Sequence, residues 1–160
     1  MIEIARHLRE TVDRALPLLN QVSEKEASLK PSFNKWSQKE ILGHLIDSAG
    51  NNQQKFIRLM ETDNLRFTSY SQDFWVSAQR YNYAKWKDLI KLWEYFNDHL
   101  AHIIEFVMPD KLANQIYIDN LGPYTLEFIM KDYVEHMKHH LKQLLPGSGI
   151  ESKFENIYNS

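Results

Sequence analysis

One stretch organises this chain: Ser37-Gln38-Lys39-Glu40-Ile41-Leu42-Gly43-His44-Leu45-Ile46-Asp47. Ser37 and Glu40 have the spacing of a capping box, in which each side chain accepts a hydrogen bond from the other residue's backbone N–H. After this start, apolar residues recur at spacings of four or seven residues, at Ile41, Leu45, Ala49, Phe56 and Met60. The pattern predicts an amphipathic helix that begins at Ser37 and continues to about Glu61.

Three further stretches have the same helical spacing, over about residues 2–21, 85–107 and 125–145. Only five glycines and five prolines punctuate the chain. One of these, Pro17, lies inside the first stretch and is expected to kink the helix or begin a fresh turn. Ile116 and Ile118 alternate with polar residues, which predicts a short extended piece before the last helix.

The connections between these helices differ in length. Residues 23–35 form a polar link, whereas residues 62–84 form a long, aromatic-rich segment without clear periodicity. Such a long segment cannot be one of the short loops of an up-down-up-down bundle. We therefore expect an all-α fold with little or no sheet: a four-helix bundle over residues 1–148, with a long crossover between helices 2 and 3 and a C-terminal tail over residues 149–160.

Composition excludes several classes of function. The chain has 160 residues and a formal net charge of −2, without the basic excess that nucleic acids or anionic membranes attract. No apolar run approaches the ~20 residues of a membrane span, and no secretory leader is evident. We expect a soluble, cytoplasmic protein. There are no cysteines, so a metal site would need His, Asp or Glu ligands.

The helical phase ranks the seven histidines. His136 and His140 are one turn apart, on the same side of the last helix's apolar face, so both can contact one metal ion. His139 points about 160° away from that face, which predicts a surface position. The same reasoning predicts three solvated histidines elsewhere, at His7, His99 and His102.

His44 lies about 135° from the apolar direction of its helix, on a stripe with Glu40, Asp47 and Asn51. This stripe is either an ordinary solvated face or the wall of a covered groove. In the second case His44 completes a three-histidine site with an open position, as catalytic metal sites have. Asp47, the weak catalytic candidate, is then an acceptor behind a ligand or a proton carrier; otherwise it is a solvated aspartate.

Two motifs resemble a known family. The stretch Trp36-Ser37-Gln38-Lys39-Glu40-Ile41-Leu42-Gly43-His44-Leu45 is similar to the helix-two signature of the DinB/YfiT-like superfamily. The first and last histidines of His136-Met137-Lys138-His139-His140 match that family's late H-x-x-x-H. The continuation through residues 47–52 and 56–58 is similar to the YfiT-like branch. The resemblance covers nearly the whole chain in order and length.

The resemblance implies the bundle with its crossover, and a divalent metal ion, often nickel or zinc, at His44, His136 and His140. It also implies a homodimer, which the apolar tail residues Phe154, Ile157 and Tyr158 favour as well. Characterised family members include thiol transferases and isomerases that use low-molecular-weight thiols, while others are regarded as hydrolases. A small-molecule substrate, such as a thiol of this kind, is therefore expected.

Three hypotheses remain open from the sequence. The first is a metal-dependent enzyme, either a thiol S-transferase or a hydrolase, whose metal faces an open pocket. Trp75 and Tyr81 of the crossover either help to wall that pocket or belong to the core. The second is a non-catalytic or stress-associated metal-binding bundle with a closed site and a large apolar dimer face. In the third, the histidines are structural and bind no metal.

Overall fold

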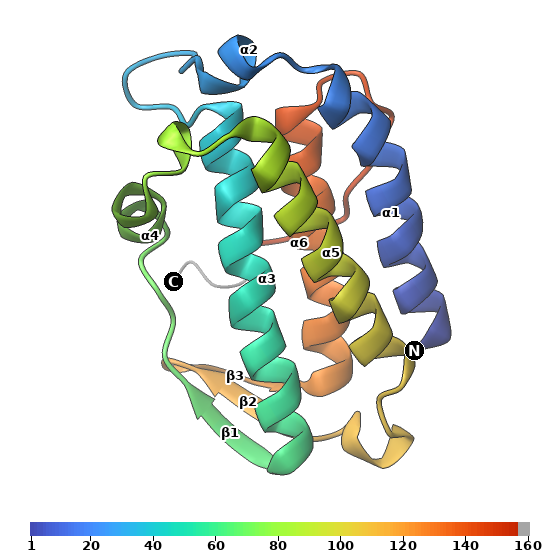
Figure 1. Ribbon diagram of the computed structural model, residues 1–160. Coiled ribbons are helices and arrows are strands. Elements are labelled where there is room, and N and C mark those ends of the chain that lie inside the picture. The colour runs from blue at the N-terminus through green and yellow to red at the C-terminus, as the bar shows by residue number, and fades with distance from the viewer. Residues whose placement is uncertain (157–160) are drawn as a thin grey trace.

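The computed structural model describes residues 1–156 and shows a helical bundle with a small sheet at one end (Figure 1). The predicted helices are all present, with boundaries close to those expected. The four long helices are α1 (Ile2–Gln21), α3 (Gln38–Glu61), α5 (Trp86–Glu105) and α6 (Leu126–Leu144). Helix α1 packs against α5, and α3 packs against both α5 and α6. The chain therefore forms the four-helix bundle that the apolar spacing predicts.

The helix starts follow from local chemistry. At α3, the Ser37 Oγ accepts from the Glu40 N–H at 3.2 Å, and Glu40 Oε2 accepts from the Ser37 N–H at 2.8 Å. This is the predicted capping box. At α6, the Thr125 hydroxyl accepts from the Phe128 N–H at 3.2 Å. Helix α1 runs through Pro17 to Gln21 as a single element.

The two connections hold more regular structure than their sequences indicated. The polar link contains α2 (Glu24–Ser28), which begins with a second capping box at Ser23 and Glu26. The crossover is not irregular: it contains a strand, a helix and a 3₁₀ turn. These are β1 (Asn64–Phe67), α4 (Gln72–Gln79) and η1 (Tyr81–Tyr83). After α5 come η2 (Pro109–Lys111), β2 (Gln115–Ile118) and β3 (Leu121–Thr125).

The three strands form one sheet in the order β1-β2-β3. Strand β1 pairs with β2 in parallel, with Leu65 opposite Ile116, and β2 pairs with β3 in antiparallel fashion. The predicted extended piece is the central strand. The parallel pairing joins the start of the crossover to the segment just before α6, so the sheet closes the end of the bundle between α3 and α6 (Figure 1).

The described part of the tail packs on the bundle. Ile150 is buried, and the Ser152 hydroxyl donates to the backbone oxygen of Glu135 at 2.7 Å. The Phe154 ring lies 5.1 Å from the His136 ring, measured between centroids. The tail residues Ile157 and Tyr158 lie outside the described residues. No helix among residues 1–156 has the length and apolarity that crossing a bilayer requires.

Candidate metal centre and its pocket

His44 lies inside the protein, not on a solvated face. Its side chain is 0% exposed, and Asp47, on the same stripe of α3, is 5% exposed. The crossover and α6 cover this stripe, because α4, η1 and α6 all pack against α3. The groove interpretation is therefore the right one. Trp36, just before α3, packs its ring at 5.2 Å from the His44 ring.

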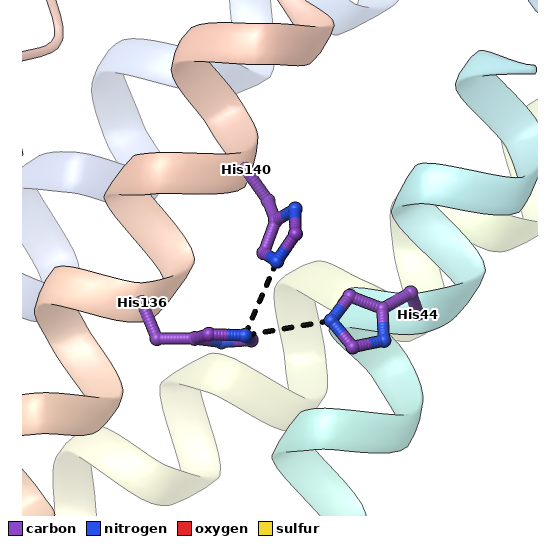
Figure 2. Close-up of side chains that lie close together, drawn as sticks. All are labelled: His44, His136 and His140. Atoms are coloured by element: carbon purple, nitrogen blue, oxygen red, sulfur yellow. Dashed lines mark hydrogen bonds between the residues drawn. The ribbon is translucent and has the colours of Figure 1, made fainter. Parts of the chain in front are cut away.

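The structure brings His44, His136 and His140 together, from α3 and α6 (Figure 2). The Nε2 atoms of His44 and His136 are 3.4 Å apart, and those of His136 and His140 are 3.2 Å apart. One ligand atom from each of the three residues lies within 4.8 Å of the other two. Among residues 1–156, this is the group of histidines and carboxylates that has the geometry of a metal site.

The outer nitrogens indicate which way the rings are protonated. His136 Nδ1 lies 3.4 Å from the Ser48 hydroxyl oxygen, and His140 Nδ1 lies 3.3 Å from Gln143 Oε1. The Gln143 amide oxygen can only accept, so this contact favours the His140 tautomer that carries its proton on Nδ1. Its Nε2 then presents a lone pair to the centre. The Ser48 hydroxyl can hold His136 in the same tautomer.

These distances fit a metal ion. A zinc ion bonded to imidazole nitrogens at about 2.0–2.1 Å in a tetrahedral site separates its ligand atoms by about 3.3–3.4 Å. The two Nε2 separations, 3.4 and 3.2 Å, agree with this value. Lone pairs that face one another at such a distance repel unless a cation lies between them. The three side chains thus form a donor set suited to a divalent ion.

Burial also prepares the histidines as ligands. It lowers the pKa of His44 to about 3 and that of His140 to about 4, with the neighbouring histidines acting in the same direction. Burial lowers the pKa of His136 as well. All three imidazoles are therefore neutral at pH 7, which is the form that binds a metal.

Asp47 is buried beside this centre but does not join it. Its Oδ1 accepts from the Tyr81 hydroxyl at 2.6 Å and from Gln79 Nε2 at 2.5 Å, both from the crossover. Its Oδ2 is buried without a hydrogen-bond partner among residues 1–156, and so is His44 Nδ1. Burial raises the pKa of the Asp47 carboxyl. No hydrogen bond links it to the three histidines among the described residues, and the bonds that its Oδ1 accepts hold the crossover against α3.

Gly43 explains how the crossover approaches α3 so closely. A Cβ atom on Gly43 would lie 2.1 Å from Cδ2 of Tyr81, far inside contact distance. The Tyr81 ring therefore occupies the space that a side chain at position 43 would need, and its hydroxyl reaches Asp47 one turn further on. A glycine in the middle of a predicted helix, next to a histidine, was the only sequence sign of this contact.

A pocket of about 290 Å³ opens onto His136 and His140. Its walls come from α3, the sheet, the crossover, α6 and the tail, and its aromatic lining residues are Phe67, Tyr70, Tyr133 and Phe154. The crossover thus contributes Phe67 and Tyr70 to the lining, and neither Trp75 nor Tyr81, for which the sequence left a pocket wall and a core position open. The Tyr81 ring is buried against α3, and the Trp75 ring packs on Tyr70 at 4.7 Å.

His139 also lines this pocket, which corrects the expectation that it faces solvent. The tail changes its surroundings: the Phe154 ring lies 5.5 Å from the His139 ring. His139 Nε2 lies 2.8 Å from the Gln143 amide nitrogen, and its ring packs edge-on against the His140 ring at 5.2 Å, outside the three-histidine group. His7, His99 and His102 are exposed, as predicted.

The fold and this centre define a bundle of a known class. The DinB superfamily profile matches residues 7–144, so the chain belongs to the DinB superfamily. Among solved structures, it is similar to one described as "YfiT from Bacillus subtilis is a probable metal-dependent hydrolase with an unusual four-helix bundle topology". The TM-score is 0.80 at 16% identity, over 89% of this chain and 82% of that one. None of the curated proteins matches the sequence significantly.

Proposed function

We propose that this protein is a metal-dependent enzyme that binds one divalent ion, zinc or nickel, at His44, His136 and His140. Its reaction is hydrolysis of a small molecule or transfer of a small-molecule thiol. The observation that carries the proposal is the convergence of three neutral imidazoles at the edge of an open pocket. Imidazole ligands suit both zinc and nickel. The likeness to the YfiT structure, described as that of a probable metal-dependent hydrolase, supports the hydrolytic branch.

When bound, a divalent ion in such a site supplies Lewis acidity and favours the deprotonated form of water or a thiol. The chain's own residues prepare for this chemistry. The Ser48 hydroxyl and the Gln143 amide orient the rings of His136 and His140. The rings of Phe67, Tyr70 and Phe154 line the pocket, and so reduce the water around a bound substrate.

Asp47 acts in this proposal as a positioning residue. Asp47 and His44 lie one turn apart on α3, and each has a buried atom without a hydrogen-bond partner among the described residues, Oδ2 and Nδ1 respectively. If His44 carries its proton on Nδ1, that atom is a donor and Asp47 Oδ2 is an acceptor. A metal-binding histidine usually donates its second N–H to such an acceptor, which fixes the tautomer. Asp47 would then keep the His44 Nε2 lone pair directed at the metal. A role in carrying protons is the alternative.

Hydrolase and thiol transferase need the same centre, and no residue pattern selects between them. Because the chain has no cysteine, a transferred thiol would come from a second small molecule. The open pocket favours an enzyme over a non-catalytic metal-binding bundle, for which a closed site is expected. The discriminating experiment is an activity panel on zinc-loaded and nickel-loaded protein, with activated esters and amides in one arm and thiols with electrophiles in the other.

We also propose that the protein is a homodimer. Leu92 and Tyr95, one turn apart on α5, and Phe106 at its end are large apolar side chains that are 49%, 66% and 68% exposed. Apolar groups that cluster on one helix face are typical of protein interfaces. Light scattering at high micromolar concentration should give about twice the mass of one chain. A strictly monomeric mass would remove this part of the proposal.

The metal site itself is tested by titration of metal-free protein with zinc and with nickel in a calorimeter. One ion should bind each chain. His136→Ala should weaken binding by at least about 100-fold, because two remaining nitrogens make a poor site. His139→Ala is the matched control and should change affinity by less than about fivefold. Loss of the metal in His139→Ala, with retention in His136→Ala, would overturn the assignment.

A further inference from the structure

Lys55 is a charged residue of the pocket that the metal centre does not use. It lies on α3 eleven residues after His44, which places it within about 20° of the same helix face and about 16 Å further along the axis. Side chains of a helix lean toward its N-terminus, so the Lys55 side chain leans back toward the histidines. It lines the same pocket as His136 and His140.

Within the part of the chain that the structure describes, the ammonium group of Lys55 has no strong partner. Its Nζ atom lies 5.4 Å from the centroid of the Phe67 ring, at cation–π distance. Among residues 1–156, Nζ makes no hydrogen bond and no ion pair within 4.0 Å. Lysine is seldom this enclosed without a partner, since a desolvated ammonium is costly. An acidic group of a ligand would supply the missing acceptor.

The charges around Lys55 keep it protonated. Burial lowers the pKa of Lys55 to about 8, while Asp132 and Asp119, which also line the pocket, act to raise it. Asp119 already has a hydrogen-bond partner, because its Oδ1 accepts from the Ser69 N–H at 3.1 Å. Among the described residues that line the pocket, Lys55 is the one lysine or arginine, so it is the residue that brings an ammonium charge to the pocket at neutral pH.

We infer that the substrate of the three-histidine centre is a small molecule with an acidic group, a carboxylate or a phosphate, that binds Lys55 while its reacting group lies at His136 and His140. The inference rests on the proposed function, because a divalent ion at the histidines makes the pocket net positive despite its two aspartates. The volume of about 290 Å³ limits the ligand to a small molecule. The Phe67 ring beneath Lys55 offers a surface for the ligand's carbon chain.

The test uses two metal-binding thiols of equal chain length, 3-mercaptopropionate, which is anionic, and 3-mercapto-1-propanol, which is neutral. Each is titrated calorimetrically into zinc-loaded protein. The wild type should bind the anionic thiol about tenfold more tightly, the amount that one charge-assisted hydrogen bond supplies. Lys55→Met keeps the straight side chain over Phe67 and removes the charge. In this variant the preference should fall to within about twofold.

Lys91→Met, an exposed position on α5 outside the pocket, is the matched control for net charge and should keep the full preference. Zinc stoichiometry, measured by mass spectrometry on all three proteins, separates the two proposals. If zinc binds but the wild type shows no preference, or Lys55→Met retains it, the inference is wrong and the proposed function stands. If the wild type binds neither zinc nor nickel, the proposed function fails and the inference falls with it.

Discussion

At the scale of single residues, the centre depends on a histidine that is both polar and fully buried. His44 is 0% exposed, and its Nδ1 has no hydrogen-bond partner in the described part of the chain. An unsatisfied buried polar atom costs about 1–3 kcal/mol, so a protein without a use for it would gain stability from an apolar residue there. A bond from His44 Nε2 to a metal ion would offset this cost, since it compensates for the lost hydration of the ring.

Asp47 offers a prediction at the same scale. Asp47→Asn keeps an oxygen that can accept from Tyr81 and Gln79, so the free energy of unfolding should change by less than about 1 kcal/mol. If Asp47 positions His44, the variant should bind zinc about tenfold more weakly, because acceptors behind metal ligands contribute that much. Calorimetry and urea unfolding measure the two effects.

The alternative role of Asp47 has a different signature. If Asp47 carries protons, Asp47→Asn should bind zinc as the wild type does and lose turnover in the activity panel. Asp47→Ala serves as the comparison, because it removes the acceptor that holds Tyr81 and Gln79 and should destabilise the fold. Normal zinc affinity and normal turnover in Asp47→Asn would exclude both roles.

At the scale of elements, the long helices were predictable and the crossover was not. The Ser37 and Glu40 capping box and the apolar spacing are local signals, so α3 could be placed from its own residues. Strand β1 has four residues, and its partner β2 lies about fifty residues further along the chain. A pairing so distant leaves no local period in the sequence, which is why the crossover had no clear pattern.

The contact between Gly43 and Tyr81 gives a prediction for α3. Gly43→Ala would place a methyl group 2.1 Å from the Tyr81 ring, so the ring must move and release Asp47. Overpacking of this kind costs about 1–3 kcal/mol, and urea unfolding should show a loss in that range. Gly50→Ala is the matched control on the same helix, where the nearest side-chain atom, on Phe96, is 3.7 Å away.

The two alanine variants should therefore differ in sign. Gly50→Ala should stabilise the protein by about 0.5–1 kcal/mol, because alanine favours a helix more than glycine does. Gly43→Ala should destabilise it despite the same gain in helix propensity. Equal effects of the two substitutions would show that Tyr81 does not pack on position 43 in solution.

At the scale of the whole molecule, the candidate site is made by segments that are distant in sequence. The pairing of His136 with His140 followed from helical phase alone, since both lie on one element. The inclusion of His44 came from family resemblance, because its own helix phase was equally compatible with a solvated face. Burial of that face depends on the crossover and α6, which no property of residues 37–61 reveals.

The buried histidines predict how the stability of the metal-free protein varies with pH. In the unfolded chain they take up protons near pH 6.5, but in the folded protein His44 and His140 do so only near pH 3 and 4. The unfolded state therefore binds more protons as the pH falls below about 6.5, and the free energy of unfolding should fall from there downward. Above pH 7 these residues should cause no change.

Urea unfolding of metal-free protein at pH values between 8 and 4.5 measures this effect. The comparison is a variant with glutamine in place of His44, His136 and His140, which keeps the carboxylates that also titrate in this range. Its stability should fall less steeply below pH 6.5 than that of the wild type. Parallel pH profiles for the two proteins would show that the three histidines are accessible to protons in the folded state.

The position of the tail has a practical consequence for preparing the protein. Phe154 and Asn156 line the pocket that opens onto His136 and His140. In Figure 1 the N-terminus lies across the bundle from the crossover, which contributes a wall of this pocket. A polyhistidine purification tag fused after residue 156 would thus bring extra imidazoles to the pocket mouth and compete for nickel or zinc during affinity chromatography. A cleavable tag on the N-terminal side avoids this artefact in every metal measurement.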